Sequence, residues 1–118
     1  MSHVIELKIK LSDPAALRDA AQVLGLELTE SQTVSFYSAS VTGTAIRLPE
    51  WRYPVIVEAD GTVRYDNYDG RWGDIATLNN LVQEYTAQVV ESQARAAGQY
   101  AWREEREDGT LVLRVGSY

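Results

Sequence analysis

The densest group of chemically active side chains lies in the middle of the chain, between Tyr53 and Asp74. This stretch, YPVIVEADGTVRYDNYDGRWGD, holds four aspartates, one glutamate, three tyrosines and one tryptophan among three glycines. Asp66, Asp69 and Asp74 could supply oxygen ligands to Ca²⁺ or Mg²⁺, or two of them could act as acid and base. However, DNYDGRWGDI lacks the alternating acidic positions and later glutamate of an EF-hand loop. We therefore expect turn formers and a helix cap here, and no metal site.

The residues that most enzymes use for covalent or metal chemistry are scarce. There is no cysteine, which excludes Cys-based metal sites and a Cys nucleophile. A catalytic triad or a His-based metal site would have to use His3, the only histidine. The GRWG run at residues 70–73 lacks the length and the Lys-Ser/Thr pair of a phosphate-binding loop. We therefore expect a non-enzymatic protein with no catalytic residues and no cofactor.

Rings and arginines on both sides of the central predicted hairpin are the group best suited to recognition. Trp, Tyr and Arg anchor protein interfaces, and they also stack on flat ligands such as bases. We expect Trp51, Tyr53 and Trp72 to enter a pocket of a protein partner, while Glu50 and the neighbouring aspartates steer basic surface toward them. The alternative for half of the rings is a place in the core, with Trp72 as a lid over the start of a helix. The predicted partner-binding residues are Trp51, Arg52, Tyr53, Asp66, Tyr68, Asp69, Arg71 and Trp72.

Two other functions are compatible with the same residues. The rings could line a concave pocket for a nucleotide or another flat molecule. The acidic chain, with a net charge of −6, could instead imitate nucleic acid as an inhibitor from a mobile element. Direct binding of nucleic acid is not expected, because the eleven Lys and Arg residues are scattered and form no basic face.

Length and composition favour a single globular domain over residues 1–118. Hydrophobic residues make up 45% and charged residues 24% of the chain, which is typical of globular proteins. No run approaches the roughly 20 apolar residues of a membrane span, and MSHVIELKIK at the N-terminus has no signal-peptide core. We therefore expect a soluble, cytoplasmic protein that does not bind membranes.

Hydrophobic periodicity predicts the elements that position these side chains. Alternation over residues 3–11 predicts a strand. Between Asp13 and Gly25 we expect a helix, because Asp13 is a typical N-cap residue and Gly25 is typical of the residue that ends a helix. Two further strands are expected around residues 33–38 and 44–48. The residues expected on the inner face of the first strand are Ile5, Leu7, Ile9 and Leu11.

The central hairpin is the most sharply defined of these elements. A three-residue loop at residues 59–61, with Gly61 in the left-handed conformation of a β-bulge, would pair Val57 with Val63. This register places apolar residues on one face and mostly polar residues on the other.

A long helix and a second hairpin complete the prediction. Asp74 is expected to cap a helix that ends near Gly98. Residues 100–106 and 110–115 predict a hairpin whose charged first strand suits the edge of a sheet. Strands in hairpins together with two helices indicate an α+β fold, with an antiparallel sheet built from hairpins and two helices packed on one face. The residues expected to face the core are Ile75, Leu78, Val82, Tyr85 and Val89 of the helix and Leu111, Leu113 and Val115 of the hairpin.

Several of these features occur together in one known family. They are the Met-Ser-His start on a strand, the Asp60-Gly61 hairpin, the DGRWG stretch, the helical LNNLVQEY run at residues 78–85 and the closing hairpin at residues 108–110. In them the chain resembles, over nearly its whole length, the family catalogued as domain of unknown function twelve fifty-seven, also called hypothetical chloroplast reading frame thirty-five. Its members are plastid, cyanobacterial and bacteriophage proteins. The resemblance implies a small soluble protein without an assigned activity, sometimes encoded near an AAA-type ATPase, which makes such an ATPase one candidate partner.

Overall fold

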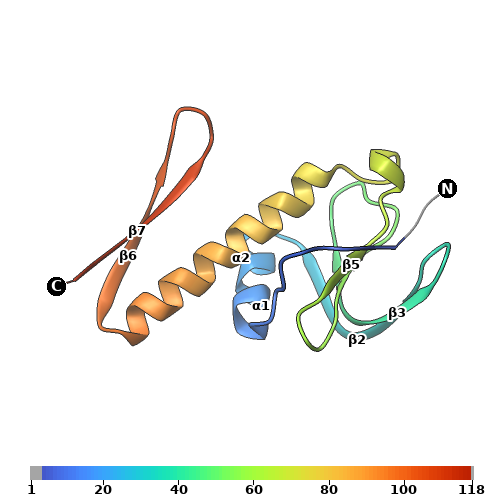
Figure 1. Ribbon diagram of the computed structural model, residues 1–118, viewed down its shortest axis with the longest axis horizontal. Coiled ribbons are helices and arrows are strands. Elements are labelled where there is room, and N and C mark those ends of the chain that lie inside the picture. Colours follow the sequence, from blue (N-terminus) through green and yellow to red (C-terminus); the bar gives the residue numbers. More distant parts are fainter. Residues whose placement is uncertain (1–3, 118) are drawn as a thin grey trace.

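The computed structural model describes residues 4–117, so His3 lies outside the described part of the chain. Five strands form one antiparallel sheet in the order β1-β5-β4-β3-β2, and the last two strands form a separate sheet (Figure 1). The fold is therefore α+β, as the sequence predicts. The elements are β1 (Ile5–Glu6), α1 (Pro14–Val23), β2 (Glu27–Ser35), β3 (Ser40–Arg47), β4 (Val55–Val57), β5 (Val63–Tyr65), the short turn η1 (Tyr68–Gly70), α2 (Ile75–Ala96), β6 (Gln99–Glu105) and β7 (Leu111–Ser117).

The central hairpin, β4–β5, has the predicted register. Val57 is paired with Val63, and Gly61 has a φ of +91°. The amide of Gly61 donates to the carbonyl of Glu58, and the amide of Glu58 donates to the carbonyl of Thr62, both at 2.8 Å. These bonds close a three-residue loop with a bulge at the glycine, as predicted for residues 59–61.

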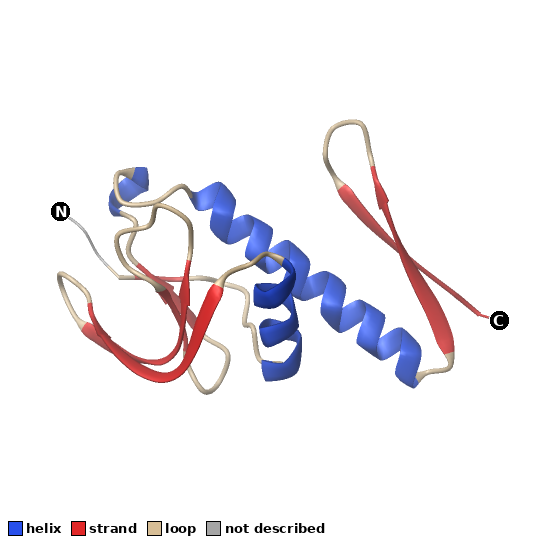
Figure 2. Cartoon of the chain, turned by 180° about the vertical axis from the view of Figure 1, so that it is seen from behind, coloured by secondary structure: helices blue, strands red, loops and turns tan. Residues whose placement is uncertain are grey.

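The main core lies between the five-stranded sheet and the two helices. Figure 2 shows both helices on the same side of this sheet. The opposite face of the sheet carries a second, smaller cluster around Phe36, Ala45 and Ile56. Alternate residues of β4 therefore enter different clusters, which is the expected consequence of a strand buried on both faces. The buried residues of the main core include Leu17, Ile46, Val55, Val57, Val63, Leu78, Leu81 and Tyr85.

Both helices begin at the predicted caps. Oδ1 of Asp13 accepts from the amides of Ala15 and Ala16, each at 3.1 Å. Oδ1 of Asp74 accepts from the amide of Ala76 at 2.9 Å. Ile75 was predicted to face the core, which is wrong, because this residue lies in the first turn of α2 and is exposed. The inward face of the helix includes Leu81 instead.

The first strand is shorter than predicted. Only Ile5–Glu6 pairs with β5, and the chain then follows β5 through single bonds from Leu7 to Val63 at 2.9 Å and from Leu11 to Gly61 at 2.8 Å. Ile5 is 39% exposed and Ile9 is 55% exposed, so their predicted places on the inner face are wrong.

The two strands expected around residues 33–38 and 44–48 are longer than predicted and pair with each other as the hairpin β2–β3. β2 covers Glu27–Ser35 and β3 covers Ser40–Arg47. The pairing shifts between Thr29 and Gln32, where Ser31 has a φ of +54°. Since β2 is an edge strand with mostly exposed side chains, its serines and threonines dilute the apolar alternation that would have marked its full length.

The closing hairpin does not join the main sheet. β6 and β7 pair only with each other and extend from the end of α2, away from the other strands (Figures 1 and 2). The expected edge strand of the main sheet is thus part of a separate two-stranded sheet, since alternation indicates the faces of a strand but not its neighbours. Leu111 and Leu113 are half-buried, whereas Val115, predicted to face inward, is exposed. Neither α1 nor α2, both in the described part of the chain, has the length and hydropathy of a membrane span.

Candidate interaction surface

Trp51 is a core residue. Its side chain is 6% exposed, and its indole N–H donates to Oγ1 of Thr77 at 2.7 Å and to the carbonyl of Asp74 at 3.2 Å. Its ring packs edge-on against Tyr65 at a centroid distance of 5.9 Å, and burial raises the pKa of that tyrosine. A Cβ atom on Gly73 would lie 2.3 Å from the indole. The expectation that Trp51 enters a partner is therefore corrected: the ring fixes the start of α2 against the sheet.

Asp66 is also buried, at 1% exposure. Its Oδ1 accepts from the amide of Tyr68 at 3.1 Å, and its Oδ2 has no partner among the described residues. The neighbouring Asn67 donates from its side chain to the carbonyl of Gly73 at 3.2 Å. Asp66 and Asn67 therefore organise the loop that follows β5, and the predicted steering role of Asp66 is corrected, because a buried carboxylate does not face a partner.

The loop that these two residues hold is strained. Tyr68, Asp69 and Gly70 have successive φ values of +47°, +51° and +91°. A non-glycine residue in this region costs on the order of 1 kcal/mol, and such strain is concentrated at functional sites. The carbonyl of Asn67 accepts from the amides of Gly70 at 3.0 Å and Trp72 at 2.9 Å. The loop therefore holds Tyr68 and Trp72 in one fixed arrangement.

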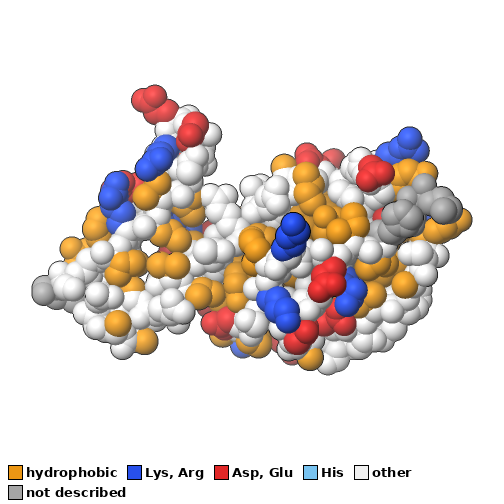
Figure 3. Space-filling model, viewed as in Figure 1, with side chains coloured by type: hydrophobic (Ala, Val, Ile, Leu, Met, Phe, Trp, Pro, Cys, Tyr) orange, Lys and Arg blue, Asp and Glu red, His pale blue; other side chains and the backbone are white. Residues whose placement is uncertain are grey.

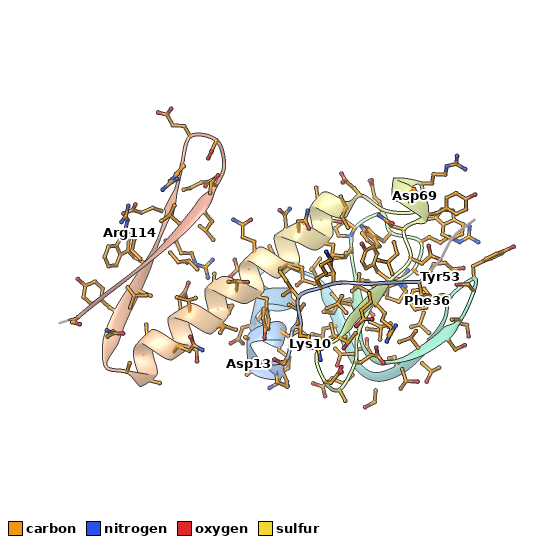
Figure 4. All side chains as sticks on the ribbon, in the orientation of Figure 1. Lys10, Asp13, Phe36, Tyr53, Asp69 and Arg114 are labelled. Atoms are coloured by element: carbon orange, nitrogen blue, oxygen red, sulfur yellow. The ribbon has the colours of Figure 1, made fainter. Side chains whose placement is uncertain are left out.

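Trp72 is the centre of a group of rings at the surface. Its half-buried ring lies 4.7 Å from Tyr68, 5.7 Å from Tyr53 and 6.4 Å from Tyr37 between centroids. Tyr53 in turn contacts Phe36 at 5.3 Å, so the rings are anchored on the smaller core cluster. Figure 4 shows Phe36 and Tyr53 at the end of the molecule away from the closing hairpin.

Two arginines lie against these rings. The guanidinium carbon of Arg52 is 4.5 Å from the Trp72 centroid and 5.6 Å from that of Tyr53. Arg71 is 4.9 Å from the Tyr68 centroid. Both arginines are exposed. The amide of Arg52 donates to the carbonyl of Trp72 at 2.8 Å, which joins the two segments that carry the arginines.

We call these four rings and two arginines the aromatic–arginine surface, and its six members are listed at the end of this paragraph. Asp69 is exposed beside it, and Figure 3 shows hydrophobic, basic and acidic side chains mixed at this end of the molecule. Tyr37 was not predicted. A single large ring in a turn of small residues, YSAS, was the available signal, but its meeting with Trp72 depends on the register of β2–β3. The members of the surface are Tyr37, Arg52, Tyr53, Tyr68, Arg71 and Trp72.

Three cavities in the described part of the chain lie away from these rings. A cavity of about 480 Å³ lies at the edge of the helix–sheet layer between Leu17, Glu30 and Glu58. None of its lining residues, or of those of two smaller cavities, is aromatic. No cluster of three or more acidic or histidine side chains within residues 4–117 could hold a metal ion.

No protein-family model, curated protein or solved structure matches this chain. The resemblance to the domain of unknown function twelve fifty-seven family therefore stays a prediction from the sequence.

Proposed function

We propose that this chain is a non-enzymatic interaction domain that binds a protein partner through the aromatic–arginine surface. The observation that carries the proposal is the partly exposed cluster of rings centred on Trp72, which includes the exposed Tyr37. Three segments far apart in the sequence supply it: the β2–β3 turn, the segment before β4 and the loop after β5. Trp, Tyr and Arg are enriched among the residues that dominate binding energy at protein interfaces. Trp and Tyr bury large rigid rings, and Arg adds several hydrogen-bond donors and stacks on aromatic faces.

The exposure of Tyr37 supports an interface more than a role in folding. This ring is 73% exposed although it contacts Trp72. So exposed a ring contributes little to the stability of the free protein, because most of its apolar area still faces water. A partner that covers Tyr37 and Trp72 together would bury that area, which is how hot-spot residues act.

The two alternative functions have less support. A nucleotide-like ligand would need a concave site lined by rings, and the rings of the aromatic–arginine surface line none of the cavities named above. A nucleic-acid mimic would need a row of free carboxylates. Seven carboxylates in the described part of the chain are instead within ion-pair distance of Lys or Arg: Glu6, Glu30, Glu58, Asp60, Glu84, Glu91 and Glu104.

Affinity capture with matched variants tests the proposal. The tagged chain and its Tyr37→Ala, Trp72→Ala and Trp102→Ala variants are incubated with lysate of the native host, and captured proteins are quantified. Trp102 is the control because it is also an exposed ring, but lies on β6 in the separate sheet. We expect Trp72→Ala to reduce capture of the partner about tenfold or more, as for an interface hot spot, and Trp102→Ala to leave it unchanged.

The thermal midpoint of each variant separates loss of binding from loss of folding. Tyr37→Ala removes a mostly exposed ring, so it keeps the fold even if Trp72→Ala does not. Equal capture by the wild type, Tyr37→Ala and a folded Trp72→Ala would refute the proposed surface. An AAA-type ATPase among the captured proteins would agree with the family resemblance.

A further inference from the structure

We infer that the partner segment that binds the aromatic–arginine surface is acidic, with carboxylates placed beside an apolar side chain. This inference rests on the proposed function and adds the chemistry of the partner. It reverses the charge that the sequence predicts, since the acidic residues of the central stretch led to the expectation of a basic partner.

Of the nine arginines in the described part of the chain, the two of this surface are those found with the guanidinium over a ring. Four arginines in the described part of the chain, Arg18, Arg64, Arg103 and Arg114, form ion pairs with glutamates. None of the ion pairs found within residues 4–117 includes Arg52 or Arg71. Instead, each guanidinium lies against a ring, at 4.5 Å from Trp72 and 4.9 Å from Tyr68.

A guanidinium held in this way is prepared for a carboxylate. The ring interacts with the flat face of the cation, whereas the N–H groups point outward in the plane of the group. Those N–H groups match the two oxygens of a carboxylate and form bidentate, charge-assisted hydrogen bonds. Because Trp72 and Tyr68 limit the rotamers of Arg52 and Arg71, less side-chain entropy is lost on binding than for free arginines.

Of the three carboxylates on which the opposite expectation depended, Asp66 is not at the surface. Asp66 is buried and bonded to the amide of Tyr68. Asp69 and Glu50 remain exposed, but both have positive φ values, of +51° and +64°. Aspartate is common in such turns for conformational reasons, so at Asp69 the acidic side chain has an explanation without a basic partner.

An acidic peptide fits this surface better than a nucleic acid. Duplex and single-stranded nucleic acids carry a charge at every phosphate and need an extended basic face. Here the net charge is −6, and the cations among the rings are two arginines with Asp69 exposed close by. One or two carboxylates can bind without meeting further repulsion, whereas a long run of phosphates cannot.

Titration with three capped peptides of equal length tests this inference. Each peptide carries phenylalanine anchors, separated by glutamate in the first, glutamine in the second and lysine in the third. The dissociation constant is measured from the NMR shift of the Trp72 indole N–H. We expect the glutamate peptide to bind about fivefold to tenfold more tightly than the glutamine peptide, because two exposed charge-assisted pairs contribute about that much. The lysine peptide should bind most weakly.

Matched charge variants identify the cations responsible. The double substitution Arg52→Gln, Arg71→Gln should abolish the preference for glutamate. The control is Arg95→Gln, Arg106→Gln, which removes the same net charge from two exposed arginines on α2 and in the turn after β6. It should leave the preference unchanged. Arg52→Glu with Arg71→Glu should make the lysine peptide the tightest ligand.

Four results of the titrations would overturn the inference. They are tightest binding of the lysine peptide to the wild type, no difference among the three peptides, an equal loss of preference in the control variant, or tighter binding of a short oligothymidylate than of the glutamate peptide. Capture of the native partner separates this inference from the proposed function. Capture that depends on Trp72 but not on Arg52 and Arg71 would leave the interaction surface in place and reject its acidic partner.

Discussion

Gly61 and Gly70 have the same φ of +91° in different surroundings. A Cβ atom on Gly61 would lie 2.8 Å from the backbone of Ser12, whereas a Cβ atom on Gly70 would meet nothing within 4 Å. Gly70→Ala should therefore cost only the conformational penalty, about 1 kcal/mol. Gly61→Ala should cost about 1–3 kcal/mol more, because the backbone of Ser12 must move. Urea unfolding measures both, and equal losses would contradict the close approach at Gly61.

Trp51 and Thr77 provide a second test at the residue scale. The indole N–H of the buried Trp51 donates to Oγ1 of the half-buried Thr77 at 2.7 Å. In a double-mutant cycle with Trp51→Phe and Thr77→Val, the coupling free energy of unfolding should be about 1 kcal/mol, the usual net value of such a bond. A coupling near zero would show that this bond does not fix α2 to the sheet. Tyr53→Phe is the control, since Tyr53 lies in the other cluster.

Single residues are where sequence reasoning about this surface reached its limit. Arg52, Tyr53, Tyr68, Arg71 and Trp72 were predictable as a group because composition alone selects them. The burial of Trp51 and Asp66 depends on contacts with α2 and with the following loop, and neither residue belongs to a periodic pattern. The place of Tyr37 in this surface could be predicted only from the β2–β3 pairing, and the polar residues of these strands gave no clear alternation from which to predict that pairing.

At the scale of elements, the closing hairpin is attached to α2 by a charged cluster. Arg103 on β6 donates from Nη1 and Nη2 to the two oxygens of Glu84 at 2.7 and 2.8 Å and from Nε to Glu91 at 2.5 Å. Gln88 also donates to Glu84 at 2.9 Å. Glu84 is buried, so its charge depends on these donors for compensation.

This cluster predicts a pH-dependent attachment of the hairpin. Burial alone would raise the pKa of Glu84, but the bonds from Arg103 and Gln88 outweigh it and hold the pKa below the ordinary value of 4.5. The ionised carboxylate therefore stabilises the attached hairpin above that value, and the stabilisation is lost as the pH falls through the lowered pKa. Native-state hydrogen exchange of the β6 and β7 amides, converted to a free energy of opening, should show this loss below about pH 4.5.

Substitution of Glu84 separates this effect from general acid denaturation. Glu84→Gln should lower the free energy of opening near neutral pH by about 1–3 kcal/mol, since hydrogen bonds to a charged group contribute that much. It should also remove the acid dependence of the hairpin amides. Glu27→Gln, an exposed change of the same charge on β2, is the control and should do neither. An acid dependence that persists in Glu84→Gln would show that another group controls the hairpin.

The elements themselves were predictable to different degrees. The register of β4–β5 and both helix caps follow from local rules, since a Gly61 bulge and the caps Asp13 and Asp74 act within a few residues. The separation of β6–β7 from the main sheet follows from no local rule. The alternation of Leu111 and Leu113 is the same whether the strand pairs with the main sheet or packs on α2.

At the scale of the whole molecule, both buried core clusters lie outside the β6–β7 hairpin. The main core takes its buried residues from the chain between Leu11 and Tyr85, and the smaller cluster takes its own from β2, β3, β4 and the segments beside them. No side chain of β6 or β7 belongs to either cluster. The hairpin is a two-stranded sheet, which is marginally stable without packing against another element. The stability of the hairpin should therefore depend on the rest of the protein, whereas the stability of the rest should not depend on the hairpin.

Deletion of residues 99–118 tests this asymmetry and the single-domain prediction together. The shortened chain should keep a cooperative urea transition and the dispersed NMR amide shifts of β4 and β5, because both core clusters are intact. The last turns of α2 should fray, because Ala94 is buried in the full chain and lies beyond the residues of the main core. Trp72-dependent capture of the partner should also survive, since the aromatic–arginine surface lies at the opposite end of the molecule (Figure 4). An unfolded product would instead make the hairpin an essential part of one folding unit, and a folded product that no longer captures the partner would move the interaction surface to β6–β7.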